Sequence, residues 1–314
     1  MAYHEARPFM FDDKIKRSSS CSTEYGNLSG HSLFAASYNM FVFLDFYYGQ
    51  FKGKKFSSIG YYTSLFFAIS LFIAIGISRF YLNAHTINQI IYGWTFGIWL
   101  AFYFHFCLRE PMMNNVKLIV EDKMNLGKRQ IFSYIAVASV VFICEFMSQI
   151  ATFLIVDKVF TPDPKWIINI ITKCGKDPKN DNSTLNYKQV VYSGIPVAFY
   201  GAYIGLFISR KLMGPTSENV QKTSQWWKFI LRYIVVAVIG IPAIVLFFFL
   251  PWKINLGILI VFKTLVPIFY ASLAIYALSY PIFKRFKLLS TVSEQQHIPA
   301  DKSIDDLQES PLSN

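Results

Sequence analysis

The sequence lacks the signatures of several common protein classes. Its four cysteines show no metal-ligand spacing, so a zinc-stabilised fold is not indicated. It contains no glycine-rich nucleotide-binding loop and no internal repeat of solenoid period. Residues 1–30 hold no apolar segment typical of a cleavable signal peptide, and none is expected before the first span. What the chain does contain is apolar sequence in unbroken runs.

These runs predict an all-α polytopic membrane helix bundle. A helix of about 20 apolar residues crosses a bilayer, and a chain in lipid must satisfy its backbone hydrogen bonds within the helix. Seven transmembrane helices are expected, at about 31–50, 59–77, 84–108, 131–156, 189–209, 229–250 and 256–283. The predicted membrane domain therefore spans 1–287, with polar loops at 109–130 and 157–188. Residues 288–314 are polar and lack aromatics, which predicts a disordered cytoplasmic tail.

The charge pattern predicts an orientation. The net charge of +11 is explained by basic loops near anionic lipid, so membrane lipids are expected partners and nucleic acid is not. Short loops on one face are consistently basic, which assigns that face to the cytoplasm. The opposite, luminal face carries residues 1–30, 78–83 and 157–188, including a glycosylation acceptor, "NST", at 182–184. Cys21 and Cys174 share this face and could form a disulfide, with two free thiols as the alternative.

Three polar clusters fall on the luminal face. They are Arg7-Pro8, the segment "SGHS" that contains His31, and "SRFYLNAHTINQ", which contains Arg79, His85 and Gln89. Helix N-termini bind oxyanions, and arginine offers planar donors suited to phosphate. His85 and Gln89 are four residues apart and share a helix face, so Gln89 could fix the histidine tautomer. The pattern predicts an oxyanion site with a nucleophilic or proton-shuttling histidine. No luminal cluster has metal-ligand spacing, so neither a metal nor another cofactor is expected.

The three segments resemble the signature of the type-2 phosphatidic acid phosphatase and haloperoxidase superfamily. That signature reads K-x6-R-P, then P-S-G-H, then S-R-x5-H-x3-D. The resemblance implies a phosphatase in which His85 attacks phosphorus and forms a phosphohistidine, assisted by Gln89. His31 would protonate the leaving oxygen and later activate water. The phosphoryl oxygens would be held by Arg7, Arg79, Ser29 and the backbone N–H of Gly30.

The chain departs from the superfamily pattern at three places. Leu28 replaces proline, a change that a turn tolerates. Gln89 replaces aspartate, so the partner of His85 is neutral and stabilises an imidazolium less. The signature lysine would fall one place before Met1. We therefore expect a truncated gene model whose full-length form has nine spans; a genuine short isoform with weak or no activity is the alternative.

Glutamine at position 89 points to two branches of the superfamily. "SRFYLNAHTINQIIYG" is similar to the corresponding stretch of glucose-6-phosphatase-like and dolichyl-diphosphatase-like enzymes. The luminal loop with Trp166 and Cys174, and "FKTLVP" with Lys263, resemble the C-terminal half of glucose-6-phosphatase. The resemblance implies an endoplasmic reticulum membrane glycoprotein with a luminal active site and a phosphorylated small-molecule substrate. A lipid phosphate or dolichyl diphosphate is the alternative, and the sequence does not indicate an oligomeric state.

Two other functional classes remain open. A non-catalytic membrane protein that binds phosphorylated ligands is motivated by Leu28, Gln89 and the missing lysine. A transporter is motivated by ionisable residues within predicted spans, namely Asp45, Glu145 and Lys263. Snorkelling to the membrane interface is the other interpretation of Lys263.

Overall fold

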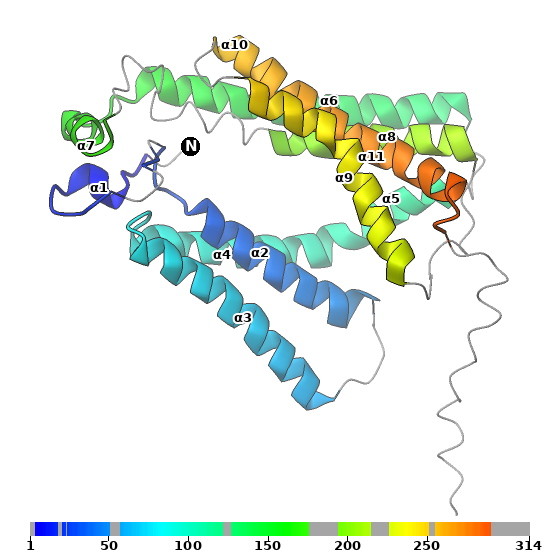
Figure 1. The fold of residues 1–314 in the computed structure, drawn as a ribbon, viewed down its shortest axis with the longest axis horizontal. Coiled ribbons are helices and arrows are strands. Elements are labelled where there is room, and N and C mark those ends of the chain that lie inside the picture. Colours follow the sequence, from blue (N-terminus) through cyan, green and yellow to red (C-terminus); the bar gives the residue numbers. More distant parts are fainter. Residues whose placement is uncertain are drawn as a thin grey trace, which may run out of the picture. The chain divides into compact units, whose positions relative to one another are not determined.

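The computed structural model describes residues 4–17, 21–22, 24–50, 57–121, 127–175, 194–214, 226–250 and 255–289. Across these ranges the structure is helical and contains no strand, which confirms the predicted all-α class (Figure 1). The helices of the first half are α1 (Pro8–Phe11), α2 (Gly30–Leu44), α3 (Ser58–Tyr81), α4 (Ile87–Tyr103), α5 (Arg109–Glu121) and α6 (Lys128–Val159). Those of the second half are α7 (Pro164–Cys174), α8 (Gly194–Met213), α9 (Trp226–Phe249), α10 (Leu256–Leu259) and α11 (Val266–Arg285). Segments of π-helix extend three of them: η1 (Asp45–Gln50), η2 (Phe104–Leu108) and η4 (Ile260–Leu265).

Five helical stretches are long and apolar enough to cross a membrane, which supports a multi-pass membrane protein. They are Ser58–Tyr81, Ile87–Val120, Lys128–Val159, Trp226–Phe249 and Leu256–Arg285. The spans expected at 31–50 and 189–209 fold as α2 with η1 and as α8, but neither belongs to these five. The count of seven transmembrane helices therefore stays a prediction.

Two segments expected as loops contain helices. Residues 109–121 form α5, because the segment has no glycine and is rich in good helix formers such as Met112, Lys117 and Leu118. The expected loop at 157–188 contains α7, which Asp163 caps by accepting a hydrogen bond from the N–H of Lys165. Gly175 ends α7 with a left-handed φ of 61°. The predicted glycosylation acceptor at 182–184 and the tail from 290 lie outside the described residues.

The contacts divide the chain into two units. Unit 1 comprises Met1–Val116, Val140–Pro196 and Pro251–Thr264, and it contains all the predicted site residues. Unit 2 comprises Lys117–Ser139, Val197–Leu250 and Leu265–Asn314. In unit 2, α9 packs on α11, and the hydroxyls of Ser139 and Tyr200 are hydrogen-bonded at 2.8 Å.

Within unit 1, α2 and α4 pack with their backbones unusually close. A Cβ added to Gly93 would lie 2.9 Å from the carbonyl oxygen of Ser29, and one added to Gly97 would lie 2.5 Å from that of Leu33. Small residues four apart allow this approach between membrane helices. Because His31 lies in the first turn of α2 and His85 lies just before α4, this packing fixes the relation between the two histidines.

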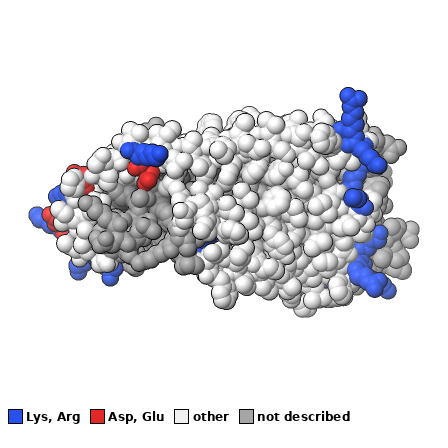
Figure 2. Space-filling model, turned by 90° about the horizontal axis from the view of Figure 1, so that it is seen from above, with Lys and Arg blue, Asp and Glu red and all other residues white. Residues whose placement is uncertain are grey.

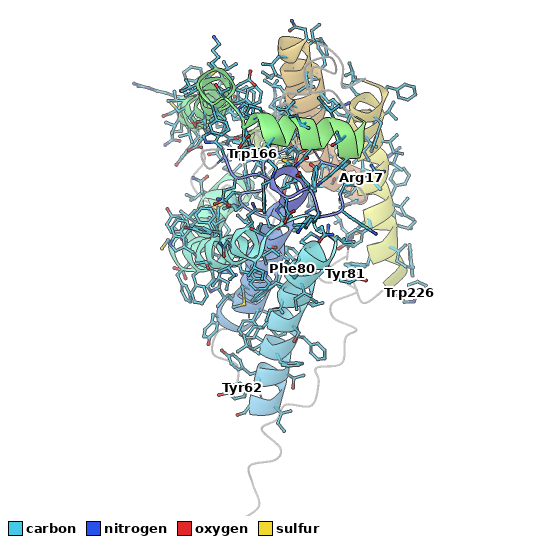
Figure 3. The ribbon with its side chains drawn as sticks, turned by 90° about the vertical axis from the view of Figure 1, so that its left-hand side faces the viewer. Arg17, Tyr62, Phe80, Tyr81, Trp166 and Trp226 are labelled. Carbon is cyan, nitrogen blue, oxygen red and sulfur yellow. A yellow bond between two sulfur atoms is a disulfide. The ribbon has the colours of Figure 1, made fainter. Side chains whose placement is uncertain are left out.

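The outer surface of the helices is suited to lipid. Most of the face drawn in Figure 2 shows neither Lys or Arg nor Asp or Glu. Tyr62 lies near the start of α3, and Phe80 and Tyr81 lie near its end, all at least half exposed (Figure 3). Aromatic side chains at both ends of a span are typical of the two membrane–water interfaces.

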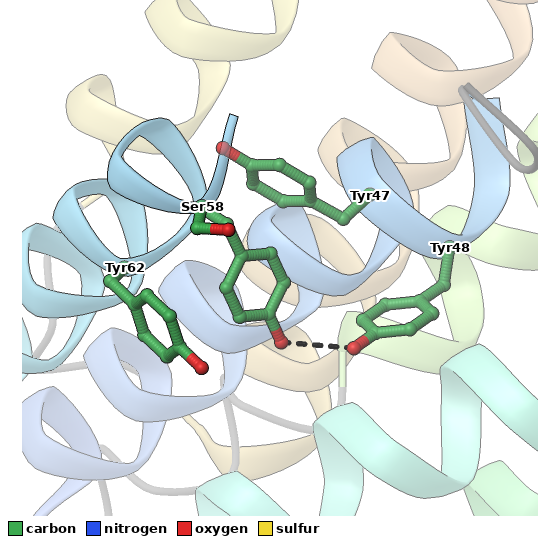
Figure 4. Close-up of a pocket in the computed structure, with 5 residues that line it drawn as sticks. Tyr47, Tyr48, Ser58 and Tyr62 are labelled. Atoms are coloured by element: carbon green, nitrogen blue, oxygen red, sulfur yellow. Dashed lines mark hydrogen bonds between the residues drawn. The ribbon is translucent and has the colours of Figure 1, made fainter. Parts of the chain in front are cut away.

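A cluster of tyrosines surrounds a cavity of about 290 Å³ at the junction of η1 and α3 (Figure 4). The cavity is lined by Tyr47, Tyr48, Ser58, Tyr61 and Tyr62. The hydroxyls of Tyr48 and Tyr61 are hydrogen-bonded at 2.9 Å. Because α3 runs from Ser58 to Tyr81, these tyrosines lie at the opposite end of the helix from His85.

Candidate active site

His85 lies in the turn between α3 and α4. Asn83 opens this turn with a left-handed φ of 54°, which asparagine adopts more readily than most residues. Thr86 then caps α4: its side chain accepts from the N–H of Gln89, and the Gln89 side chain accepts from the N–H of Thr86. The turn leaves the His85 side chain only 5% exposed.

The hydrogen bonds of His85 define its tautomer. Nδ1 lies 2.9 Å from the carbonyl oxygen of Gly26 and 3.3 Å from Oε1 of Gln89, both of which only accept. Nδ1 therefore carries the proton, and Nε2 accepts from Nη1 of Arg7 at 3.3 Å. Burial, followed by the positive charge of Arg7, lowers the pKa of His85 to about 4. At neutral pH the ring is thus uncharged, with its Nε2 lone pair directed at the arginine.

Arg7 is buried, at 8% exposed, and is held by backbone carbonyls. Its Nε donates to the carbonyl of Glu24 at 2.8 Å, and its Nη1 donates to that of Ala84 at 3.0 Å. The carboxylate of Glu24 forms a longer ion pair with Nη2, at 3.7 Å. These contacts aim a guanidinium, a good donor to phosphoryl oxygens, at the imidazole of His85.

Gln89 is 1% exposed and joins the N-terminal segment to α4. Its Nε2 donates to the carbonyl of Ala6 at 3.0 Å and to Oε2 of Glu5 at 3.4 Å. The residue lies beside His85 as predicted, but the carbonyl of Gly26 is the closer acceptor for Nδ1. A Cβ on Gly26 would lie 2.5 Å from Oε1 of Gln89, so a larger residue here would displace the end of the Gln89 side chain.

The segment "SGHS" forms the start of α2. Ser29 is buried and caps the helix: its Oγ accepts from the N–H of Ser32 at 3.4 Å and from the Ser32 hydroxyl at 2.9 Å. Its own N–H donates to the carbonyl of Gln89 at 3.1 Å. Gly30 is exposed, and nothing lies within 4 Å of where its Cβ would be. The exposed side chain of His31 follows. The first turn of α2 is therefore open for an anion, whereas the Ser29 hydroxyl is occupied as a cap.

Arg79 lies in the last turn of α3 and is half-buried, with Nε donating to the Ser78 hydroxyl at 3.3 Å. Burial, followed by the positive charges of Arg79 and then Arg7, lowers the pKa of His31, and His31 is among the groups that lower the pKa of His85. The fold therefore brings the three sequence clusters to one place. Contacts through hydrogen bonds join Arg7, His85, Gln89 and Ser29, and electrostatic interactions join His31 and Arg79 to them.

A cavity of about 350 Å³ lies beside His85. Its lining combines apolar side chains with a few polar ones and comes from α1, the end of α3 and the start of α4. The lining residues are Pro8, Phe11, Ile15, Phe80, Asn83, His85, Thr86, Ile87 and Asn88. A pocket of this size and chemistry can bind the organic part of a phosphate ester next to the histidine.

Comparison with known proteins agrees with this arrangement. Residues 1–112 match the model of the PAP2 superfamily. The matched region contains Arg7, the start of α2, and the turn with His85, which are the elements that converge in the site. The match makes this region, about a third of the chain, similar to that superfamily. No curated protein and no solved structure matches the chain.

The site of this PAP2-like region includes groups that the sequence motifs do not mark. The carbonyls of Gly26, Glu24 and Ala84 orient His85 and Arg7. Every residue carries a carbonyl, so no residue-type pattern could have identified these three. Among the described residues there is no group of three His, Cys, Asp or Glu side chains that could hold a metal ion.

Two ionisable residues of the predicted spans occupy other places in unit 1. Asp45 forms an ion pair with Arg109. Lys263 lies in η4 and is 1% exposed, so it is buried in protein and does not snorkel to a membrane interface.

Proposed function

We propose that this chain is an integral membrane phosphatase that hydrolyses a phosphate ester through a phosphohistidine on His85. The observation that carries the proposal is the state of the imidazole. Its Nδ1–H is fixed by the carbonyl of Gly26, and its Nε2 lone pair faces the guanidinium of Arg7. A phosphoryl group bound by Arg7 would meet a neutral, oriented nucleophile, and phosphoryl transfer depends chiefly on such positioning and charge stabilisation.

The reaction would proceed in two steps. First, Nε2 of His85 forms a bond to phosphorus as the ester P–O bond breaks, and His31 gives its proton to the leaving oxygen. Then water attacks phosphorus, the N–P bond breaks, and His31 takes the proton of the water. Arg7, Arg79 and the N-terminus of α2 at Gly30 would stabilise the phosphoryl oxygens. Ser29 would contribute by capping α2, since its hydroxyl is engaged with Ser32.

Two substrate classes have support. The glutamine at position 89 fits both glucose-6-phosphatase-like and dolichyl-diphosphatase-like enzymes, and the likeness of "FKTLVP" to the C-terminal half of glucose-6-phosphatase favours a sugar phosphate. The cavity beside His85 favours a lipid phosphate, because Pro8, Phe11, Phe80 and Ile87 give it apolar walls. A luminal site in the endoplasmic reticulum membrane suits both, and the Cys21–Cys174 disulfide supports the placement, because disulfides persist in oxidising compartments.

The test uses full-length protein reconstituted in vesicles, with a chelator present. Phosphate release is measured from glucose 6-phosphate, dolichyl diphosphate, phosphatidate and sphingoid phosphates. Rapid acid-free quenching with ³²P-labelled substrate should trap label on His85, and the His85→Ala variant should trap none. Hydrolysis only of lipids would reject the sugar phosphate. Saturable binding without release or trapping would reject catalysis and favour a binding protein, whereas uptake into the vesicles without hydrolysis would favour a transporter.

A further inference from the structure

We infer that α7 clamps the N-terminal segment in place and that Lys173 is a positioning residue for Arg7. This inference rests on the proposed function, because it concerns how the phosphate-binding arginine reaches its position. It assigns a role to α7, which begins at Pro164 and therefore lies outside residues 1–112, the region matched to the PAP2 superfamily.

Lys173 binds the segment that follows Arg7 through three backbone carbonyls. Its Nζ donates to the carbonyl oxygens of Phe9 at 3.0 Å, Asp12 at 2.7 Å and Ile15 at 3.1 Å. An ammonium group has three N–H donors, and here the three carbonyls match that number. Hydrogen bonds from a charged donor are stronger than neutral ones, so this cradle is a firm attachment.

Further contacts fasten the same segment to α7. Nδ2 of Asn169 donates to the carbonyl of Met10 at 2.8 Å, and both partners are buried. Cys174 forms a disulfide with Cys21, which realises the pairing that the sequence left open. Phe9, also fully buried, belongs to the apolar core that α7 shares with this segment. Figures 1 and 3 show α7 lying against α1.

The carbonyls of Glu24 and Ala84 hold the guanidinium of Arg7, but its backbone depends on the clamp because its own helix is too short to hold it. Arg7 is the N-cap of α1, which has only four residues. A single helical turn is not stable by itself in water, so the place of α1 is set by what it packs against. The contacts of Lys173, Asn169 and Cys174 begin two residues after Arg7 and therefore fix the point from which its guanidinium reaches His85.

The experiment compares two lysines of the same helix. Lys173→Met keeps the length of the side chain and removes its donors, and it should lower kcat/KM by about 10- to 100-fold, as expected when a binding group shifts by about 1 Å. Lys165→Met is the matched control, since Lys165 is exposed and makes only a 3.8 Å pair with the exposed carboxylate of Asp13. The control should stay within about threefold of wild type, because exposed ion pairs contribute little. Lys173→Arg keeps donors and should recover part of the activity.

A double-variant cycle separates positioning from general damage. If Lys173 acts through Arg7, then Lys173→Met should cost almost nothing in an Arg7→Ala background. The inference is wrong if Lys173→Met lowers kcat/KM by the same factor with Arg7 present and in the Arg7→Ala variant. It is also wrong if Lys173→Met has wild-type kinetics. Thermal unfolding of each variant in the same detergent shows whether a loss of activity comes from unfolded protein.

The two proposals can fail separately. If wild type hydrolyses its substrate and Lys173→Met does so equally well, the inference is wrong and the proposed function stands. If wild type hydrolyses nothing, the proposed function is wrong, and the inference is judged by inorganic phosphate binding, measured as a ligand-induced rise in Tm. In that assay Lys173→Met should weaken phosphate binding when Arg7 is present and should have no effect in the Arg7→Ala variant. An absence of phosphate binding by wild type would overturn both.

Discussion

The helices α2, α3 and α4 carry polar clusters at both ends, and the two clusters are built differently. At the histidine end, Arg7, His85 and Gln89 are buried and bonded mainly to backbone carbonyls of other segments. At the tyrosine end, hydroxyl groups bond to one another, as Tyr48 does to Tyr61, and Asp45 pairs with Arg109.

The difference distinguishes a site from an anchor. At the tyrosine end the Tyr48 and Tyr61 hydroxyls bond to each other and the Tyr47 hydroxyl donates to the carbonyl of Gly60 at 3.1 Å. Partly exposed tyrosines are typical of a membrane interface. At the histidine end, carbonyls hold the histidine and the arginine so that an imidazole lone pair and a guanidinium face each other. In the proposed mechanism a phosphoryl group binds to this guanidinium and this imidazole. Polarity alone therefore does not distinguish the two ends.

The largest contrast is expected between two buried histidines. His85→Ala should lower kcat by at least about 10³-fold, because loss of a covalent nucleophile removes the reaction path. His105→Ala, at the tyrosine end, removes a side chain that is equally buried, and should leave kcat within about threefold. Steady-state kinetics on the best substrate of the panel, with protein amounts normalised by folded fraction, measures both. Equal losses of kcat in the two variants would contradict a special role for His85.

Two glycines give a second matched pair. A Cβ on Gly26 would lie 2.5 Å from the Gln89 side chain, and one on Gly49 would lie 2.7 Å from Arg109 and Asp45. Gly26→Ala should displace the acceptor of His85 and lower kcat/KM by about 10- to 100-fold. Gly49→Ala introduces a similar collision away from the histidine, so it should lower Tm with little effect on kcat/KM. A Gly26→Ala variant with normal kinetics would show that the carbonyl does not orient the imidazole.

The pH dependence of kcat/KM should reflect the titration of His85 and should not depend on residues at the tyrosine end. With its pKa lowered to about 4, His85 is neutral above that pH and becomes protonated below it. The kcat/KM of the free enzyme should therefore fall about tenfold per pH unit below pH 4, and His105→Ala should leave this limb in place. Because the unfolded chain binds this proton near pH 6.5, folding stability should also fall as the pH drops from 6.5 to 4. An activity loss centred near pH 6.5 would contradict the buried, neutral state of His85.

The smallest effect is expected at the tyrosine end. Tyr48→Phe removes the hydroxyl that bonds to Tyr61 and keeps the ring. Because both groups are near the surface, the free energy of unfolding should change by about 1 kcal/mol or less. Activity should be unchanged. Thermal unfolding in lipid nanodiscs and kinetics on the same sample provide the measurement, and a tenfold loss of kcat would link the tyrosine cluster to catalysis.

The sequence predicts the helical class and the converging motifs because both depend on side-chain type. Apolar runs predict helices, and the motif residues are recognised by their type. His85, however, lies in the turn before α4, so it contacts Gln89 from outside the helix and not from a shared helix face. The contacts of Gly26 and Glu24 could not be predicted, since they are made by backbone carbonyls. The helix α7 was missed in a loop judged by its polarity, although Asp163, Pro164 and Gly175 supply its capping signals. Gly93 and Gly97 of α4 are four residues apart, and this spacing of small residues predicts close packing of membrane helices.

The disulfide between Cys21 and Cys174 spans 153 residues of sequence, and this separation sets an order of events during synthesis. Arg7 leaves the ribosome long before α7 does, because translation proceeds at about 5–20 residues per second from the N-terminal side. Before Lys173 and Cys174 have emerged, the segment that carries the arginine can make its contacts with Glu24, Ala84 and Gln89 but not those with α7. The nascent chain can thus pair α2 with α4 early, while the attachment of the N-terminal segment to α7 forms late. A ribosome-bound chain that stops short of α7 should therefore hold His31 and His85 in place and leave Arg7 less firmly positioned than in the finished protein.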